Sequence, residues 1–538
     1  MFKRLSVLVA LLSPAAFGAD DGTFAGIVSS ASPEATSAGV RILEAGGNAV
    51  DAAVAVSLAL AVSEPAGSGI AGQTVMLIRE PGKPAQVVHG TTWSPRELPP
   101  GIEPVQLREG RTATTVPSTL AVLDVAWRRF GSGTVGWPEL VQPAIDVASD
   151  GFIVGPFRHR SFRAYADDLR QQPEAAQIFL GKDGGIPQVG DRIRQPKLAR
   201  TLNRVARDGA ATFYTGTMAR EIADDMAANG GWITLEDLTG FPEPAIVPAL
   251  SSEYRGHTIE TLPPPFGGWV ALQALELLET ESAGTLAADD DARRLALIDA
   301  LRAAQTSRRS TPVTDYADYD DAVQERLSPD TIRELAGGSQ GGETTHFTVV
   351  GADGTVVAVT QSIDSYFGAK VVHPSLGFLY NNYMQGFQLD DPQAPYYIEA
   401  RQMPLSSMSA TVVSRDGRAV LGLGSPGSAR IISAVAQVTS HWIDVGQGVE
   451  AAVAAWRVHA QPGDRAWVEG PGMSPVLLGG LAERGLTLVR PAYGVSDSHL
   501  DPYFGGVHAL AFENGAWTGA ADPRRDGTVD VARRKSAP

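Results

Sequence analysis

A threonine that follows a run of glycines is the residue in this sequence best suited to nucleophilic chemistry. Residues 337–342 read Gly-Gly-Ser-Gln-Gly-Gly, and Glu343 then leads into Thr344 at the start of a β-branched, apolar stretch. Flexible glycines let the peptide between Glu343 and Thr344 adopt a strained, exposed geometry, so that the Thr344 hydroxyl could attack the carbonyl before it. The sequence therefore predicts self-cleavage between Glu343 and Thr344.

Cleavage at this point would give Thr344 both groups that acyl transfer requires. A threonine hydroxyl is a weak nucleophile until a base removes its proton, and a free α-amine, with a pKa of about 8, can act as that base. No histidine is needed, and we expect His346 to be an ordinary strand residue. The competing interpretation is a surface linker followed by a strand, because threonine is common in strands.

Further motifs along the chain resemble those of the γ-glutamyltranspeptidase family. The segment after Thr344 matches the processing site and first hairpin of that family over residues 344–362. The other matching segments occur in family order at 46–53, 64–70, 404–409, 424–431 and 521–524. Since they span nearly the whole chain, the protein is identified as a member of this family.

The resemblance implies an α+β fold, a four-layer αββα sandwich of the N-terminal-nucleophile hydrolase type. Two autoprocessed fragments would build it, a large subunit of residues 19–343 and a small catalytic subunit of residues 344–538. Residue patterns predict helices and strands in both. We expect helices from 33 to the glycines at 46–47, at 49–62, 118–130, 137–149, 198–208, 217–229 and 268–278, and from 429 onward, with strands at 75–78, 87–88, 345–350, 355–363, 410–413 and 419–422.

The resemblance also implies roles for residues around the nucleophile. Gly427 and Ser428 would offer backbone N–H groups to the oxyanion, at a place where the family usually has two glycines. Ser362 stands where a family threonine bonds the nucleophile, and Ser406 and Ser407 match serines that bind the substrate α-carboxylate. Without the resemblance, residues 427–428 would indicate a turn, Ser362 an ordinary strand serine, and residues 406–407 a loop.

The residues that recognise the amino-acid head of a substrate depart from the family pattern. Thr91 stands where the resemblance implies a carboxylate-clamping arginine, and Arg96 is a nearby alternative. Tyr383 and Gly386 replace the glutamine and the aspartate that hold the substrate α-amine. Asp364, where an asparagine is usual, could supply a new contact to that amine.

Three functions follow from this pattern. The first is an enzyme that hydrolyses or transfers a γ-glutamyl or related acyl group, from amides such as glutathione, through an acyl-Thr344 intermediate. The second is an acylase for a glutaryl-like or other side-chain amide. The third is an inactive exported binding protein, against which the intact Thr344 argues. The segment 387–406 is shorter than in family members that fold a lid over the pocket, so the resemblance implies an open pocket, which favours hydrolysis over transfer.

Composition excludes several other classes of protein. The chain has 538 residues with a net charge of −16, so we expect no nucleic acid as a partner. The resemblance implies a small γ-glutamyl or related amide as substrate, and the two fragments of the precursor as each other's partners. It contains no cysteine, which excludes disulfides and thiolate chemistry, and its nine histidines are scattered, so we expect no metal and no cofactor. The basic groups at 308–309 and 533–535 are expected to be solvated.

The first residues have the pattern of a secretory signal peptide. Lysine and arginine precede an apolar run at 5–12, and small residues follow near Gly18. We place its end after Gly18, with Ala19 as the alternative. The apolar run is too short to cross a bilayer, so we expect no membrane insertion and an exported protein, periplasmic or secreted.

Overall fold

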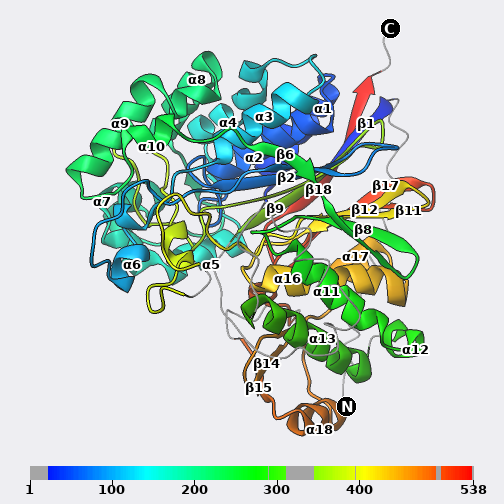
Figure 1. The fold of residues 1–538 in the computed structure, drawn as a ribbon. Helices are drawn as coiled ribbons and strands as arrows, with labels where there is room; N and C mark the ends of the chain where they lie inside the picture. The colour runs from blue at the N-terminus through cyan, green and yellow to red at the C-terminus, as the bar shows by residue number, and fades with distance from the viewer. Residues whose placement is uncertain (1–21, 289, 311–343, 394–395, 492–498, 536–538) are drawn as a thin grey trace, which may run out of the picture.

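The computed structural model describes residues 22–288, 290–310, 344–393, 396–491 and 499–535. Two antiparallel sheets face each other in this part of the chain, and helices cover the outer face of each (Figure 1). This arrangement confirms the predicted αββα sandwich. The predicted signal peptide (1–18) and Glu343 lie outside the described residues.

The first sheet has seven strands within the described ranges and holds the predicted nucleophile at its centre. Their order is β18 (Thr528–Lys535), β1 (Gly22–Ser30), β9 (Thr345–Gly351), β10 (Val356–Ser362), β2 (Gln73–Arg79), β3 (Gln86–His89) and β6 (Ala245–Pro248). β9 and β10 form the predicted hairpin, with Val350 opposite Val356 and His346 opposite Thr360. Thr344 therefore enters the sheet at an inner strand, flanked on both sides.

The second sheet, of six described strands, packs on the first through an apolar layer. Its order is β17 (Ala516–Ala521), β16 (His508–Glu513), β12 (Arg418–Gly424), β11 (Thr411–Arg415), β8 (His257–Thr261) and β7 (Leu250–Tyr254). β11 and β12 are the second predicted strand pair. Between the sheets, Val75, Leu77 and Val350 meet Val412 and Leu510, all fully buried.

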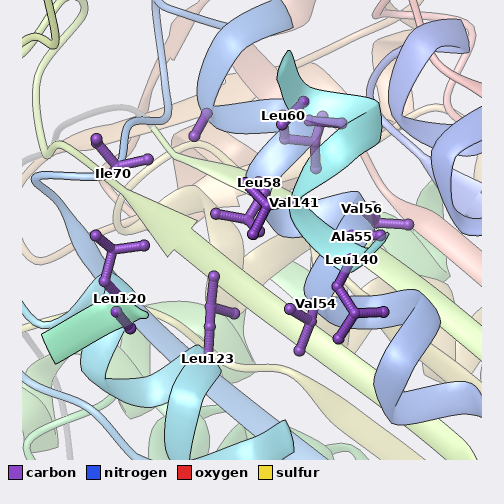
Figure 2. Close-up of a cluster of buried hydrophobic side chains, with 14 of the residues drawn as sticks. Val54, Ala55, Val56, Leu58, Leu60, Ile70, Leu120, Leu123, Leu140 and Val141 are labelled. Carbon is purple, nitrogen blue, oxygen red and sulfur yellow. The ribbon is translucent and has the colours of Figure 1, made fainter. Parts of the chain in front are cut away.

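Helices from the first half of the chain cover the first sheet. They include α1 (Pro33–Glu44), α2 (Ala49–Ser63), α3 (Thr119–Phe130), α4 (Trp137–Asp150), α8 (Pro196–Asp208) and α9 (Gly216–Ala228), all at predicted positions. Every residue of α2 is buried, as its apolar sequence predicts, and Asn48 and Asp51 close a capping box at its start. Figure 2 shows Leu58 of α2 beside Val141 of α4, within one buried apolar cluster.

A second helical layer covers the other sheet. It consists of α11 (Gly268–Glu279), α13 (Asp291–Ser310), α16 (Arg430–Ser440) and α17 (Val449–Ala454) (Figure 1). Their apolar side chains, such as Trp269, Leu297 and Val435, form one buried cluster with the sheet. α11 and α16 were predicted, whereas α13 was not, because five arginines interrupt the apolar pattern of its sequence.

The remaining described elements are small. They are α5 (Pro156–Ala164), α6 (Ala166–Arg170), α7 (Pro173–Phe179), α10 (Leu235–Thr239), α12 (Ala283–Ala287), α18 (Pro475–Glu483), β4 (Phe152–Ile153), β5 (Arg192–Ile193), β13 (Val458–Ala460), β14 (Arg465–Val468) and β15 (Thr487–Val489). No described helix combines the length and apolar character that crossing a bilayer requires.

Candidate active site

Thr344 is held closely where the chain enters β9. It is 5% exposed, and Gly67 lies directly against its main chain. A Cβ on Gly67 would stand 3.0 Å from the Thr344 carbonyl oxygen, closer than ordinary contact, so only glycine fits without displacement. The next residue, Thr345, donates its hydroxyl to the buried Glu64 carboxylate. The loop after α2 thus fixes the position of Thr344.

His346 has the structural role that the sequence predicts. Its ring is fully buried, with Nδ1 2.9 Å from Thr360 Oγ1 and Nε2 3.2 Å from Thr348 Oγ1. Burial holds the pKa of His346 well below its ordinary value. The imidazole is therefore neutral, and both of its nitrogens already have hydrogen-bond partners.

Packing between the sheets brings the end of β12 against the first residues of β9. Gly422 faces Thr348, because a Cβ there would stand 3.0 Å from its methyl carbon. Gly424 faces the His346 ring in the same way, with a Cβ distance of 2.3 Å. The end of β12 therefore packs against the first residues of β9. Gly427 follows three residues after Gly424, in the turn that leaves this strand.

The main chain of that turn has the features expected of oxyanion donors. Within the described residues, the N–H groups of Gly427 and Ser428 donate no hydrogen bond, whereas their carbonyls accept from Arg430 and Ile431 at 3.1 and 2.8 Å. Gly427 has φ 117° and Ser428 has φ 57°, so both lie in the left-handed region. The φ angle of Ser428 is one that a serine can adopt at some energetic cost. Replacing the usual glycine by Ser428 is therefore compatible with this turn.

The motif at 521–524 supports this turn from behind. Asp522 forms ion pairs with Arg457 at 2.7 Å and Arg524 at 3.0 Å, all three side chains being buried. Burial opposes ionisation, but the two guanidinium groups hold the pKa of Asp522 well below its ordinary value. The same carboxylate accepts the Val507 N–H at 2.7 Å, which anchors the segment whose Gly505 packs on Gly427.

Four side chains form a polar wall at the end of β10, and three of them were predicted site residues. The Ser362 hydroxyl accepts the Asp364 N–H at 2.7 Å and also bonds Tyr383. Gln385, which the sequence did not single out, donates Nε2 to Asp364 Oδ2 at 2.6 Å. The structure therefore brings Ser362, Asp364 and Tyr383 together.

Ionisation within this polar wall is shifted by burial. Loss of water raises the pKa of the half-buried Asp364 to about 6, although the hydrogen bond from Gln385 acts in the opposite direction. Burial, aided by the nearby Asp364 carboxylate, raises the pKa of Tyr383 well above its ordinary value. Asp364 therefore changes charge close to neutral pH, while Tyr383 stays protonated.

Thr91 and Arg96 lie in different surroundings. Thr91 is buried and donates to Gln73 Oε1 at 3.3 Å, and Gln73 is the strand partner of Ser362. Arg96 instead pairs with Glu236 of α10 at 3.1 Å and lines a cavity of about 360 Å³. The structure thus gives Arg96 carboxylate partners of its own, Glu236 and Asp237.

The predicted serine pair is backed by a buried arginine. Ser406 is buried and Ser407 half-buried, and Arg308 Nη1 donates to Ser407 Oγ while Nη2 donates to the Ser406 carbonyl, both at 2.9 Å. The prediction that Arg308 is solvated is wrong, because the last turn of α13 runs beneath the serine loop. Arg533 and Arg534 are exposed as predicted.

The segment after the polar wall folds back on itself. Phe387, Tyr396 and Ile398 form a small buried cluster with Leu107 and Met384. A cavity of about 590 Å³ adjoins it, lined by Gln385, Arg108 and Phe387 among others. Whether this leaves the reaction centre open to bulky substrates stays a prediction. The described residues contain no group of three or more acidic, histidine or cysteine side chains suited to a metal ion.

Comparisons with known proteins agree with this geometry. The model of the family described as gamma-glutamyltranspeptidase matches residues 35–532. The glutathione hydrolase proenzyme of Escherichia coli (strain K12) is 31% identical, over 95% of this chain and 93% of its own. The acylase ACY 1 proenzyme of Pseudomonas sp. (strain V22) is 34% identical, over 94% and 93%.

Solved structures share the fold over the whole chain. The crystal structure of cephalosporin acylase from Bacillus halodurans superposes with a TM-score of 0.80 at 25% identity, covering 97% of this chain and 99% of its own. The similarity therefore extends across both sheets and both helical layers, and includes the segments that carry the candidate site.

Proposed function

This chain belongs to the γ-glutamyltranspeptidase family, and we propose that it cleaves γ-glutamyl or related side-chain amides through an acyl-Thr344 intermediate. The observation that carries this proposal is the position of Thr344. It precedes an inner strand and lies against Gly67. The turn after β12 supports the same proposal, because its Gly427 and Ser428 N–H groups have no partner within the described residues and are available to an oxyanion. Relatives named glutathione hydrolase and acylase are in keeping with an amide-cleaving enzyme.

The first step of the proposed reaction sequence is maturation. Thr344 Oγ1 attacks the carbonyl carbon of Glu343, the C–N bond of that peptide breaks, and the acyl group moves to oxygen as an ester. Water then hydrolyses the ester, which leaves a carboxylate on Glu343 and a free α-amine on Thr344. The products are the two fragments 19–343 and 344–538, in line with relatives that are named proenzymes.

Turnover then uses the same hydroxyl. The α-amine accepts the proton of Oγ1 as the oxygen attacks the substrate amide, and Gly427 and Ser428 donate their N–H groups to the oxyanion. The amine passes the proton to the leaving nitrogen, and an acyl ester remains on Thr344. Water, or an acceptor amine, attacks the ester and restores the free hydroxyl.

The polar wall supports a γ-glutamyl substrate. Ionised Asp364, close to Ser362, could bind the α-ammonium group that Tyr383 and Gly386 no longer hold. Ser406 and Ser407 would bind the carboxylate, as the family pattern implies. The loss of two amine-binding residues supports a second candidate, an acylase for a glutaryl-like group that lacks the amine.

Two measurements test this proposal. Denaturing electrophoresis with N-terminal sequencing should find a fragment that begins at Thr344. A single uncut chain would contradict the proposal and favour an inactive binding protein. The release of p-nitroaniline from γ-glutamyl and glutaryl anilides then separates the two candidate substrates, because only the first carries an α-amine.

Export is the remaining part of the proposal. Residues 1–18 have the composition of a signal peptide, so the large fragment should begin at Ala19 or Asp20. Intact-mass measurement of that fragment, purified from the periplasm or medium of the producing cells, checks the site. A fragment that retains Met1 in those compartments would contradict it.

A further inference from the structure

We propose that Arg308 is the positioning residue that makes the site select acyl groups carrying a carboxylate, in the role of the arginine that Thr91 replaces. The inference rests on the proposed function and narrows its substrate class to amides of dicarboxylic or amino-dicarboxylic acids. Arg308 belongs to α13 and is far from Thr91 in sequence, so neither motif nor spacing indicates it.

The contacts of Arg308 place its charge directly behind the serine pair. The side chain is 8% exposed, and its two terminal nitrogens bond Ser407 Oγ and the Ser406 carbonyl, each at 2.9 Å. A guanidinium fork that spans two neighbouring residues fixes both of them. The serine loop is held further by Pro265, whose carbonyl accepts the Ser406 N–H at 3.1 Å.

The charge of Arg308 is not neutralised by the described part of the protein. Its two acceptors there are neutral, no described carboxylate pairs with it, and its Nε has no described partner. Burial lowers the pKa of Arg308 to about 10, with nearby Tyr396 acting in the opposite direction. The side chain therefore stays charged at neutral pH. A buried charge of this kind is costly unless an anion joins it, which a substrate carboxylate would do.

Hydrogen bonding from behind prepares both serines as donors. Ser407 Oγ accepts from Arg308, so its own proton is free to point elsewhere, and Ser406 Oγ accepts the Met408 N–H at 3.4 Å. A hydroxyl whose lone pair is engaged in this way can donate forward to a carboxylate oxygen. Two such donors in front of one buried cation suit a carboxylate better than a neutral group.

The same helix also contacts the turn that would hold the oxyanion. Gln305, one turn before Arg308 on α13, donates Nε2 to the Ala429 carbonyl at 3.1 Å, immediately after Ser428. The serine pair and the turn at Gly427 and Ser428 are therefore both held by α13. This gives α13, which the sequence did not predict, a direct part in placing both ends of the acyl group.

Exchange of Arg308 tests the inference against two anilides that differ only in the carboxylate. We expect the wild-type enzyme to prefer glutaryl over pentanoyl p-nitroanilide. Arg308→Gln should lower kcat/KM for the glutaryl compound about 30-fold, mainly through KM, and change the pentanoyl value by less than about threefold. Arg308→Lys should fall between, because it keeps the charge and loses the fork. Arg96→Gln, which removes an arginine paired with Glu236 of α10, is the matched control.

Calorimetric titration with glutarate and with its neutral analogue glutaramide adds a readout that needs no turnover. Wild-type protein should bind glutarate at least about tenfold more tightly than glutaramide, and Arg308→Gln should abolish the difference. Equal binding of the two by wild-type protein would overturn the inference, even if Arg308→Gln cannot be purified folded. So would an equal fall of both anilide activities in a folded variant. Arg308-dependent glutarate binding without any amide cleavage would overturn only the proposed function.

Discussion

Around Thr344 the contacts come from the main chain, whereas around Asp364 they come from side chains. Gly67 lies against the Thr344 carbonyl, and the Gly427 and Ser428 N–H groups, which we propose as oxyanion donors, have no partner within the described residues. The Asp364 wall instead consists of a serine hydroxyl, a phenol and a glutamine amide. The two regions lie at opposite ends of the same acyl group in the proposed reaction.

The difference explains which parts of the family pattern this chain keeps. A main-chain N–H donor is kept when its residue is substituted, provided that the new residue can adopt the same φ angle. Ser428, in a place where glycine is usual in the family, has φ 57°. A side-chain contact is lost with a single substitution, as at Thr91, Tyr383 and Gly386. The reaction chemistry can therefore persist while the recognised substrate changes.

The contrast between the two regions assumes that Thr344 is required for both self-cleavage and turnover. Thr344→Ala removes the nucleophile, so it should abolish both self-cleavage and anilide hydrolysis, with a loss of about 10⁴-fold or more in kcat. Electrophoresis and p-nitroaniline release measure the two effects. Thr344→Ser keeps a hydroxyl and should retain cleavage. Turnover by an uncut Thr344→Ala protein would contradict the assignment.

A methyl group at Gly67 should have the next largest effect. Its Cβ would stand 3.0 Å from the Thr344 carbonyl oxygen and push the nucleophile out of line, which we expect to lower kcat about 100-fold with little change in fold. The matched control is Gly479→Ala, where nothing lies within 4 Å of the added carbon. Comparable kcat values for the two variants would show that the main-chain contact is not needed.

Substitution of Asp364 tests the contribution of the side-chain contacts to substrate binding. Asp364→Asn should lower kcat/KM for γ-glutamyl anilide about tenfold at pH 8, and change the glutaryl value by less than about threefold. Because the pKa of Asp364 is about 6, wild-type kcat/KM for the γ-glutamyl compound should rise as pH increases through 6. That rise should vanish in the variant. A pH profile that keeps it would assign the ionisation to another group.

The same pKa also predicts a stability effect. A carboxyl whose folded-state pKa is raised binds its proton more tightly in the folded than in the unfolded chain, so the free energy of unfolding falls as pH rises from about 4 to 6. Asp364→Asn removes this loss. Its melting temperature relative to wild type should therefore be higher at pH 8 than at pH 4, as measured by calorimetry.

The smallest effect is expected at Ser428. Ser428→Gly relieves a left-handed conformation and keeps the N–H, so the free energy of unfolding should rise by about 1 kcal/mol while kcat falls by no more than about threefold. Urea unfolding and anilide kinetics measure these changes. A tenfold loss of kcat would indicate that the hydroxyl itself takes part, and would narrow the difference between the two regions.

The sequence predicted the elements whose local pattern matches their surroundings. α2 is apolar on every side and buried on every side, and the β9–β10 hairpin lies where a turn separates two β-branched runs. Most predicted boundaries lie within two residues of the observed ones, as for α3 and α11. Local periodicity sufficed because these elements pack in the manner that their own residues favour.

Arg308 and Gln385 could not be predicted in this way. Arg308 contacts residues almost a hundred positions later, and nothing in an Arg-Arg pair tells a buried fork from a solvated charge. Gln385 lies between two positions that depart from the family pattern, which drew attention to Tyr383 and Gly386 and away from the residue that bonds Asp364. Both roles depend on tertiary contacts that no local pattern encodes.

The order of strands in the first sheet has a consequence for refolding. β1, β2, β3 and β6 precede Thr344 while β9, β10 and β18 follow it, and strands of the two sets are paired at β18–β1, β1–β9 and β10–β2. A nick before Thr344 would leave every one of these pairings intact, so dilution alone could not part the pieces. After denaturation, however, the nicked molecule would have to reassemble from two chains, and its recovery would slow as concentration falls, whereas the uncut precursor would renature at a rate independent of concentration.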